Sequence, residues 1–159
     1  MKIGIISDTH GFLPTAARRA LAGVDHIIHA GDIGGQHILD ELELIAPVTA
    51  VYGNCDYPGD YDTVTESASI TLSGTRLLIA HKPDSITEAL MGRGGLPAHA
   101  PLPHICIHGH THVPRKEHVG VALMLCPGSP VRPRGGSEPS IMLLELTTGK
   151  PPSVILQSL

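Results

Sequence analysis

Three histidines stand at every second position of the stretch IHGHTH, residues 107–112, directly after an apolar run that favours a buried strand. In an extended chain, side chains two residues apart point to the same side of the backbone. His108, His110 and His112 would then project together, and the commonest partner of clustered neutral imidazoles is a metal ion. A competing interpretation is an exposed, histidine-rich turn. Further metal-binding side chains elsewhere in the chain decide between the two.

Polar side chains of the same kind follow four other apolar segments of the sequence. Each of these segments reads as a strand, and ligands of open α/β sheets bind outside the carboxyl ends of strands. We therefore expect the polar side chains to meet at one edge of a sheet. The expected metal donors are Asp8, His10, Asp32, Asn54, His81, His110 and His112.

This donor set has a definite chemistry. Seven donors are too many for one tetrahedral zinc site, and they fit two ions that share a bridging carboxylate. Oxygen and imidazole donors without a thiolate cluster suit Mn²⁺, Fe or Zn²⁺. We expect Mn²⁺, with Zn²⁺, Fe and Ni²⁺ as alternatives. Two such ions about 3.5–4 Å apart lower the pKa of a bridging water and stabilise the oxygens of a phosphoryl transition state.

Composition limits the class of protein. The chain has 159 residues, of which 42% are apolar, and a net charge of −4 with histidine neutral. This length favours a single domain over residues 1–159 with a core that needs no disulfides. Without a block of Lys and Arg, the chain has no electrostatic footprint for nucleic acid or an anionic membrane. The cysteines form no disulfide or CxxC pattern, and the apolar runs are too short for a signal peptide or a membrane span, which predicts a cytoplasmic location.

The first part of the chain alternates strands and helices. Strands are predicted at residues 2–7, 25–30 and 47–53, and helices at residues 13–24 and 35–46. Such alternation is typical of an α/β core with a parallel sheet.

The second part reads differently. It predicts a hairpin around Ser73-Gly74, a short helix capped by Ser85, a loop at residues 92–103 and a strand at residues 104–109. Two more hairpins, turning at Gly120 and at Thr148-Gly149, are separated by a long loop. We expect an α/β first half packed on a mostly antiparallel second half, as two sheets with helices outside.

The ordered motifs DTH (8–10), GD (31–32), GNCD (53–56), His81 and GHTH (109–112) resemble the calcineurin-like metallophosphoesterase superfamily. The resemblance covers nearly the whole chain and is greatest to small bacterial and archaeal phosphodiesterases, which also carry the cysteine form of the GN motif and a late PGS. It implies an α/β fold, a two-sheet mixed β-sandwich flanked by helices in α/β/β/α layers. It also implies one ion held by Asp8, His10, Asp32 and His112, and a second held by Asp32, Asn54, His81 and His110.

The function that the resemblance implies is a dimetal phosphodiesterase acting on a small phosphoester by in-line attack of a hydroxide that bridges the ions. Asn54, Cys55 and Asp56 are the candidate catalytic residues. Asn54 would stabilise charge, and Asp56 either orients a neighbour or caps a turn. The alternatives are a phosphomonoesterase or nucleotidase using the same site, and a non-catalytic interaction scaffold of the same fold. A homo-oligomer is left open.

Some positions depart from the family pattern. Cys55 stands where many members have a histidine thought to protonate the leaving group, and a thiol with a pKa of about 8.5 is a weaker acid. We favour a space-filling role for it. Lys82 replaces a glycine and either meets a phosphate oxygen or lies in solvent. Arg132 and Arg134 either bind an anion or anchor their loop through a salt bridge. Specificity is expected to come from the loops at residues 83–103 and 127–139.

Overall fold

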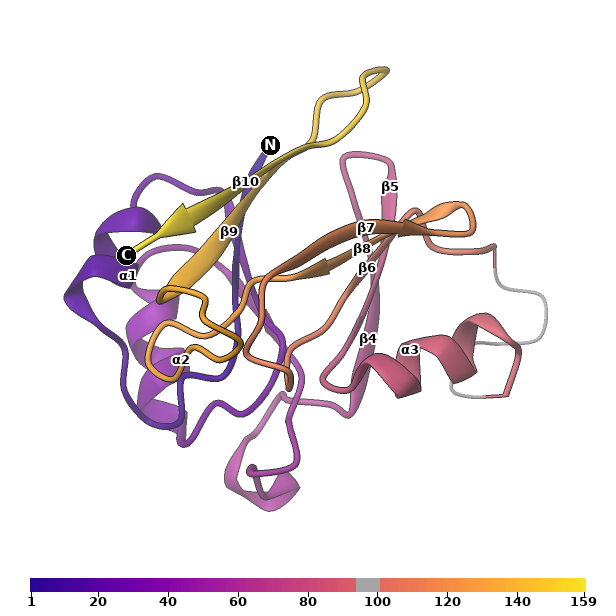
Figure 1. The fold of residues 1–159 in the computed structure, drawn as a ribbon. Coiled ribbons are helices and arrows are strands. Elements are labelled where there is room, and N and C mark those ends of the chain that lie inside the picture. The colour runs from indigo at the N-terminus through magenta and orange to yellow at the C-terminus, as the bar shows by residue number, and fades with distance from the viewer. Residues whose placement is uncertain (94–100) are drawn as a thin grey trace.

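The computed structural model describes residues 1–93 and 101–159 (Figure 1). In its first part the elements are β1 (Lys2–Ile6), α1 (Thr15–Ala20), β2 (His26–His29), α2 (Gln36–Glu43), β3 (Val48–Ala50) and the 3-10 turn η1 (Pro58–Asp60). They continue with β4 (Ser67–Leu72), β5 (Thr75–Ala80), α3 (Pro83–Leu90), β6 (Ile105–Ile107), β7 (Arg115–Val119), β8 (Ala122–Cys126), β9 (Ser140–Glu145) and β10 (Ser153–Ser158). The loop expected at residues 92–103 lies largely outside the described residues.

The strands form two five-stranded mixed sheets, with strand orders β10-β9-β1-β2-β3 and β4-β5-β6-β8-β7. In the first sheet β1, β2 and β3 are parallel, while β9 and β10 add an antiparallel edge. In the second sheet β5, β6 and β8 are parallel, and β4 and β7 lie antiparallel at the two edges. Each sheet therefore contains three neighbouring parallel strands whose carboxyl ends lie at one edge.

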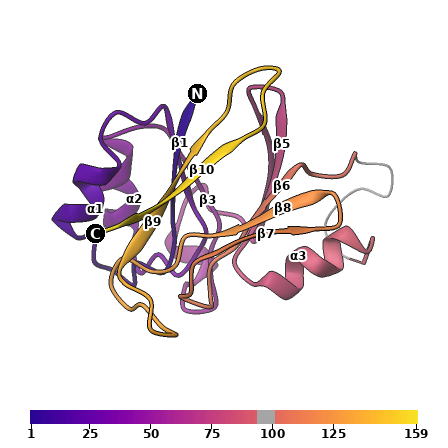
Figure 2. The same cartoon turned by 45° about the horizontal axis from the view of Figure 1, so that its top comes forward.

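Three apolar clusters hold together the layers that are seen in Figures 1 and 2. Between the sheets, side chains such as Ile5 and Ile79 are fully buried in an aliphatic core. On the outer face of the first sheet, α1 and α2 pack apolar residues that include Ile38. On the outer face of the second sheet, α3 packs Ile86 near Met124. The predicted α/β/β/α sandwich is confirmed.

The burial patterns explain why these segments form these elements. β1 and β2 are buried almost throughout. β1 is mostly apolar, as buried parallel strands are, while β2 has Ile27 and Ile28 between two histidines. Helix α2 buries Ile38, Leu39 and Leu42, which share one face at helical spacing. The edge strand β4 alternates exposed and half-buried residues, which is typical of a strand covered on one side.

The predicted helices differ from the observed ones at their ends. α1 covers Thr15–Ala20, which is shorter than the helix expected at residues 13–24. α3 begins at Pro83, and a proline suits the first helical position because its missing N–H needs no partner there. Ser85 therefore lies inside the first turn and does not cap the helix, contrary to our expectation. As a result, α3 starts directly after His81-Lys82.

The second half is less antiparallel than the sequence predicts. All three hairpins expected from local turns, β4–β5, β7–β8 and β9–β10, are present, but β9–β10 joins β1 in the first sheet. The inner pairs β5–β6 and β6–β8 are parallel, because turn signals identify only strands that are adjacent in the chain. None of the helices within residues 1–93 and 101–159 has the length and apolar character needed to cross a membrane.

Candidate metal centre

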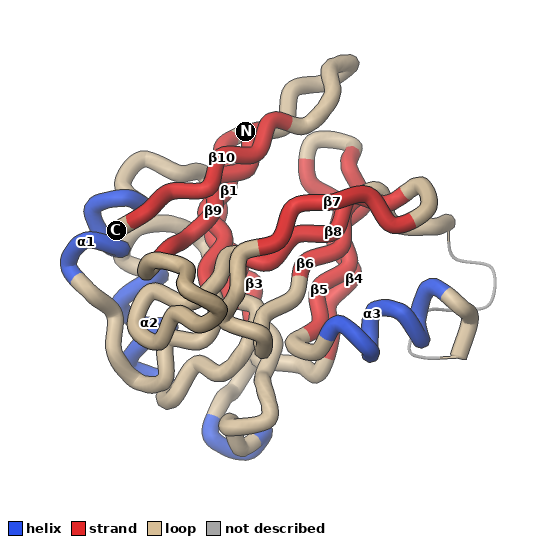
Figure 3. Tube along the Cα trace, in the orientation of Figure 1, coloured by secondary structure: helices blue, strands red, loops and turns tan. Residues whose placement is uncertain are grey.

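All seven expected donors follow parallel strands, at the lower edge of the two sheets in Figure 1. Coil segments from both sheets meet there (Figure 3). The first sheet supplies the segments after β1, β2 and β3, and the second sheet supplies those after β5 and β6. The donors are Asp8, His10, Asp32 and Asn54 from the first sheet, and His81, His110 and His112 from the second.

Five donors have a left-handed backbone, which is uncommon for residues with side chains. The φ angle is 57° at Asp8, 46° at His10, 51° at Asp32, 67° at His110 and 60° at His112. Aspartate and histidine tolerate this region better than most residues, but each instance still costs of order 1 kcal/mol. The pairing of donors at i and i+2 thus comes from left-handed turns, not from the pleat of an extended strand as the sequence suggested.

Four donor atoms form a compact cluster. Asp8, His10, Asp32 and His112 each offer one ligand atom, and these atoms all lie within 4.8 Å of one another. His10 Nε2 lies 3.4 Å from His112 Nε2 and 3.9 Å from Asp32 Oδ2. Asp8 Oδ1 lies 3.2 Å from His112 Nε2. The set predicted for the first ion is therefore assembled from both sheets.

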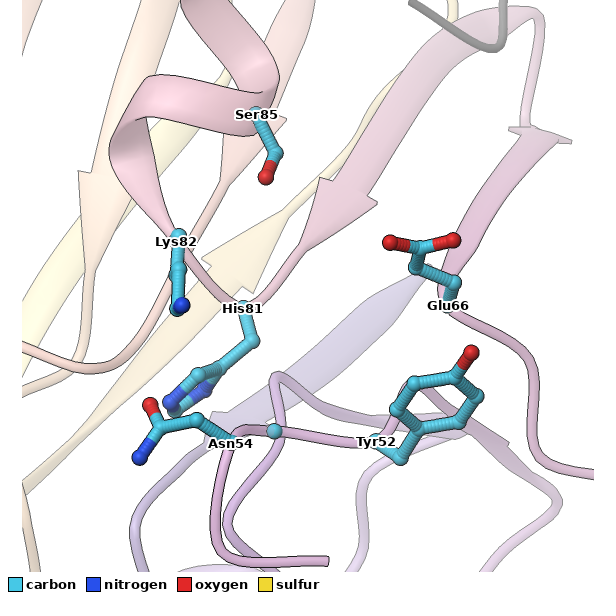
Figure 4. A pocket seen from close by; sticks show the side chains of 7 residues that line it. Tyr52, Asn54, Glu66, His81, Lys82 and Ser85 are labelled. Atoms are coloured by element: carbon cyan, nitrogen blue, oxygen red, sulfur yellow. The ribbon is translucent and has the colours of Figure 1, made fainter. Parts of the chain in front are cut away.

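Asp32 also faces the set predicted for the second ion. Its Oδ1 lies 3.4 Å from His81 Nε2, and the rings of His81 and His110 meet edge to face with centroids 5.2 Å apart. Asn54 and His81 line the same pocket (Figure 4). The two oxygens of Asp32 thus point to different histidines, Oδ2 to His10 and Oδ1 to His81, as a bridging carboxylate requires.

Acceptor atoms face one another in this cluster. His112 Nδ1 donates to the Arg132 carbonyl at 2.6 Å, and His81 Nδ1 donates to the Ala30 carbonyl at 2.8 Å. In a neutral ring Nε2 is then a bare acceptor, yet each Nε2 faces a carboxylate oxygen. Within the described residues, the buried atoms Asp8 Oδ1 and His81 Nε2 have no hydrogen-bond partner. A divalent cation between such acceptors resolves the conflict, so the donor set fits metal ions.

Carboxylates and imidazoles in the site shift one another's pKa values. Burial opposes the charge of His81, but Asp32, the Ala30 carbonyl and Asp8 outweigh it and raise the pKa of this ring. Burial raises the pKa of the Asp8 carboxyl above its usual value. Burial acts in the same sense on Asp32, but the neighbouring His81 ring and the hydrogen bond from the Cys55 amide hold the pKa of Asp32 well below its usual range. Burial lowers the pKa of His10 and of His110, which keeps both rings neutral near pH 7 and able to bind a metal.

His108 does not join the other two histidines of its motif. Its side chain is fully buried, and its Nδ1 donates to the carbonyl of Gly109 at 2.9 Å. It therefore supports the backbone beside the site. Because His112 is also buried, with 2% of its surface exposed, the alternative of an exposed histidine-rich turn is wrong.

Asp56 ties two donor-bearing loops together. Its carboxylate accepts hydrogen bonds of 2.8–3.1 Å from the amides of Ile33, Gly34 and Gly53 and from the hydroxyl of Tyr61. Burial opposes the charge of Asp56, but these hydrogen bonds outweigh it and lower the pKa of the carboxyl. Of its two expected roles, Asp56 orients neighbours: it fixes the loop that carries Asp32 against the loop that carries Asn54.

Sequence reasoning missed the hydroxyl groups that hold the donors. Ser7 Oγ donates to Asp8 Oδ2 at 2.7 Å, and Ser129 Oγ donates to the Asp8 carbonyl at 2.8 Å. Thr9 Oγ1 donates to a backbone carbonyl at 2.8 Å and lies 2.9 Å from Nε2 of the buried His29. The PGS motif after β8 is a signal for Ser129, whereas the hydroxyls beside Asp8 follow no recognisable spacing.

Two glycines are required here because neighbouring side chains approach them closely. A Cβ on Gly53 would lie 2.1 Å from Asp32 Oδ1, and a Cβ on Gly109 would lie 1.9 Å from Ser7 Oγ. Any side chain at either position would displace the carboxylate of a donor or its supporting hydroxyl.

Cys55 lies beside Asn54 at the exposed side of the site. Its amide donates to Asp32 Oδ1 at 2.8 Å, and its Sγ accepts a hydrogen bond of 3.4 Å from Asn54 Nδ2. Burial and then the Asp32 carboxylate raise the pKa of the thiol, so Cys55 is protonated near pH 7. The thiol is therefore a weaker acid than an ordinary cysteine.

Three basic side chains lie near the centre. Burial lowers the pKa of His110, and the charges of His81, Lys82 and Arg134 add to that effect; the charge of Arg132 likewise adds to the effect of burial on His10. Within the part of the chain that the structure describes, none of the three basic residues forms a salt bridge. The loop is held instead through its backbone, by the hydrogen bond from His112 to the Arg132 carbonyl.

A pocket of about 190 Å³ opens beside Asn54 and His81 (Figure 4). Its lining differs from the loops expected to set specificity. The segment 83–103 contributes Ser85 and the segment 127–139 contributes no residue, although residues 94–100 lie outside the described chain. The lining residues are Tyr52, Gly53, Asn54, Glu66, His81, Lys82 and Ser85.

Comparison with known proteins agrees with this site. The sequence matches the family model of the calcineurin-like phosphoesterase superfamily domain over residues 1–149. A probable metallophosphoesterase of Methanothermobacter thermautotrophicus is 35% identical over 166 residues, covering 99% of this chain and 93% of that protein. The structure of an archaeal phosphodiesterase superposes with a TM-score of 0.75 at 27% identity, covering 99% of this chain and 100% of that one.

A second structural neighbour shares the fold alone. Vps29 of Entamoeba histolytica, solved in complex with Zn²⁺, superposes with a TM-score of 0.73 at 19% identity, covering 99% of this chain and 98% of that one. The match to the family model, the similarity to the probable metallophosphoesterase and the assembled donor set agree. The chain belongs to the calcineurin-like phosphoesterase superfamily.

Proposed function

We propose that this protein is a divalent-metal-dependent phosphodiesterase in which residues 1–159 form one domain. The observation that carries the proposal is the cluster of four donor atoms within 4.8 Å of one another, extended by His81 against Asp32. Divalent ions in such a site supply a water of lowered pKa and stabilise phosphoryl oxygens. Mn²⁺ is the proposed occupant, because the donors are oxygen and imidazole without thiolates. We also propose a cytoplasmic location.

The chain's own residues have separable roles in this proposal. Asp32 fixes the two donor sets relative to one another, and Asp56 is a positioning residue that acts through the loops. The exposed amide of Asn54 is free to donate to a phosphoryl oxygen. Lys82 and Arg134 lie near His110 and favour an anionic substrate at this side of the centre.

Two other functions use the same fold. A phosphomonoesterase could use the same site residues. Only a comparison of monoester and diester hydrolysis distinguishes it from a phosphodiesterase. A non-catalytic scaffold would have no need of bare acceptors at a protein surface, yet all seven expected donors are present here. The intact donor set therefore favours an enzyme.

The test is hydrolysis of bis(4-nitrophenyl) phosphate by protein stripped of metal and reloaded with Mn²⁺. Asp32→Asn keeps the shape of the side chain and an acceptor for the Cys55 amide, but removes the charge between the two donor sets. We expect kcat/KM to fall by about 10²-fold or more, with an unchanged circular dichroism spectrum.

The matched control is Asp60→Asn, the same change at an exposed position in η1. It should retain the activity of the parent protein. Near-normal turnover of a folded Asp32→Asn protein would refute the proposal, as would a higher kcat/KM for 4-nitrophenyl phosphate than for the diester.

A further inference from the structure

The pocket beside the metal centre carries opposite charges at its two ends. Lys82 lies with Asn54 and His81 at the end next to the centre, while Glu66 lies beside Tyr52 at the other end (Figure 4). Both charged side chains are exposed, and within the described residues neither forms a salt bridge. Their charges are therefore available to a bound molecule.

The far end of the pocket is held by a fixed backbone contact. Val51 and Thr65 form an isolated parallel bridge, in which the amide of Tyr52 donates to the Thr65 carbonyl at 3.0 Å. Val51 is fully buried, which anchors the bridge in the core. The bridge places Glu66 next to Tyr52, and Tyr52 stands two residues before Asn54. The bridge fixes the backbone that carries Tyr52 and Glu66, so both side chains project from neighbouring segments at the same end of the pocket (Figure 4).

A carboxylate beside an aromatic ring recognises an ammonium group, through charge and through the negative face of the ring. The phosphate of a bound ester lies at the metal end, where Lys82 disfavours a second cation. A volume of about 190 Å³ has room for a short alcohol. These properties fit a molecule that is anionic at one end and cationic at the other.

We propose that the pocket selects phosphodiesters of a short alcohol that carries an ammonium group, with Glu66 and Tyr52 as the residues that determine specificity. This inference rests on the proposed phosphodiesterase function. The ester bond is cleaved at the metal centre, while the ammonium group is bound at the far end of the pocket and takes no part in the reaction.

Two substrates of equal shape test the proposal. 4-Nitrophenyl phosphocholine and 4-nitrophenyl 3,3-dimethylbutyl phosphate share a leaving group, and they differ in one atom, a charged nitrogen in place of a neutral carbon. We expect kcat/KM of the Mn²⁺-loaded protein to be about tenfold higher for the choline ester. In calorimetric titrations, phosphocholine should bind more tightly than 3,3-dimethylbutyl phosphate by a similar factor.

Variants test whether the preference for the choline ester comes from the end of the pocket that carries Glu66 and Tyr52. Glu66→Gln should reduce the ratio of the two kcat/KM values to about one or below, and Tyr52→Leu should reduce it in part. Glu88→Gln is the matched control, because it removes an exposed carboxylate from α3 that does not line the pocket. It should retain the ratio of the parent protein.

The outcomes separate this inference from the function on which it rests. Equal kcat/KM values for the two esters, in a protein that hydrolyses bis(4-nitrophenyl) phosphate, would overturn the inference alone. A preference that persists in Glu66→Gln would overturn its assignment to this pocket. If the Mn²⁺-loaded protein hydrolyses none of the three diesters, the proposed function itself is wrong.

Discussion

The imidazoles of the metal centre are fixed by their second nitrogen. In His81 and His112, Nδ1 donates to a main-chain carbonyl, so the tautomer and the ring orientation are set by the backbone. Main-chain carbonyls after β2 and β8 thereby determine which atom reaches the metal. A histidine is needed for both tasks at once, since no other side chain donates from one nitrogen while it binds a metal with the other.

Cys55 is the residue whose role is most open to measurement. Its thiol is protonated near pH 7, and its sulfur accepts a hydrogen bond from Asn54. These properties suit a space-filling side chain better than a proton donor. We predict that Cys55→Ala lowers the hydrolysis of aryl esters and of unactivated alkyl esters by a similar factor, below about tenfold. The measurement is a series of kcat values against leaving-group pKa.

A role of Cys55 as general acid would give a different dependence on the leaving group. General acid catalysis contributes about 10²–10⁴-fold, and a nitrophenolate needs almost none of it. If Cys55 delivers the proton, the loss in Cys55→Ala will grow with the pKa of the leaving group. If kcat of Cys55→Ala depends more steeply on leaving-group pKa than kcat of the parent protein does, the space-filling role is contradicted.

The donors themselves were predictable residue by residue, while their supports were not. The seven donors stand in short ordered motifs after apolar runs, and these motifs are visible in the sequence. Ser129 reaches Asp8 across 121 residues, and Glu66 reaches the pocket only because Thr65 pairs with Val51. Contacts of this kind depend on how distant segments pair, which no local pattern records.

At the scale of elements, β2 carries a buried histidine that links two donor-bearing loops. His29 Nδ1 accepts from the Gly31 amide at 3.2 Å, and its Nε2 lies 2.9 Å from the hydroxyl of Thr9. The hydroxyl in turn donates to a backbone carbonyl after β2. This chain of hydrogen bonds requires a neutral ring with its proton on Nε2.

The neutral ring of His29 makes stability depend on pH. Burial lowers the pKa of His29 to about 4 in the folded protein, against about 6.5 in the unfolded chain. Between these values the unfolded chain binds a proton that the folded protein does not, so stability falls as the pH falls. From pH 7 to pH 5 we expect a loss of about 2 kcal/mol from this residue, measured by urea denaturation in EDTA.

Two variants isolate the contribution of His29. In His29→Gln, which has no titrating ring, the free energy of unfolding should fall less between pH 7 and pH 5. His118→Gln changes an exposed histidine of β7 and should keep the slope of the parent protein. Equal slopes in His29→Gln and the parent would show that other groups cause the acid sensitivity.

The elements were predicted unevenly, for a physical reason. Hairpins depend on local turns such as Ser73-Gly74, and the sequence located them. The parallel pairs of the second sheet join strands that are separated by a helix or a hairpin, and their register comes from packing in the core. α1 also ends earlier than predicted, at Ala20, in a turn that leads to Gly23, whose φ of 76° is left-handed.

At the scale of the whole molecule, the metal centre connects the two sheets. His112 and His81 come from the second sheet, and they meet Asp8 and Asp32 from the first. The proposed ions would act as a non-covalent link across the open edge of the sandwich. Binding to the folded state alone stabilises it by an amount that depends on ion concentration.

We therefore predict that removal of metal lowers the melting temperature. At about 100 times its dissociation constant an ion adds about 2.7 kcal/mol, which corresponds to about 5–10 °C for a chain of this size. Scanning calorimetry in EDTA and in Mn²⁺ measures the difference. Elemental analysis of the reloaded protein should approach about two Mn²⁺ per chain.

The control for this prediction is the double variant His10→Ala/His112→Ala, which lacks both histidines of the first donor set. Its melting temperature should respond to Mn²⁺ much less than that of the parent. An equal shift in both proteins would place the stabilising ion elsewhere, and a content of one ion per chain in the parent would exclude the dinuclear centre.

The left-handed backbone of five donors also has an evolutionary consequence. Glycine or asparagine would relieve strain at Asp8, His10, Asp32, His110 and His112. A lineage that no longer needed the ions would gain stability from almost every such replacement, so drift would erase the donors quickly. Aspartate and histidine nevertheless occupy all five positions of this chain, as expected if the proposed ions offset the cost of the strained backbone.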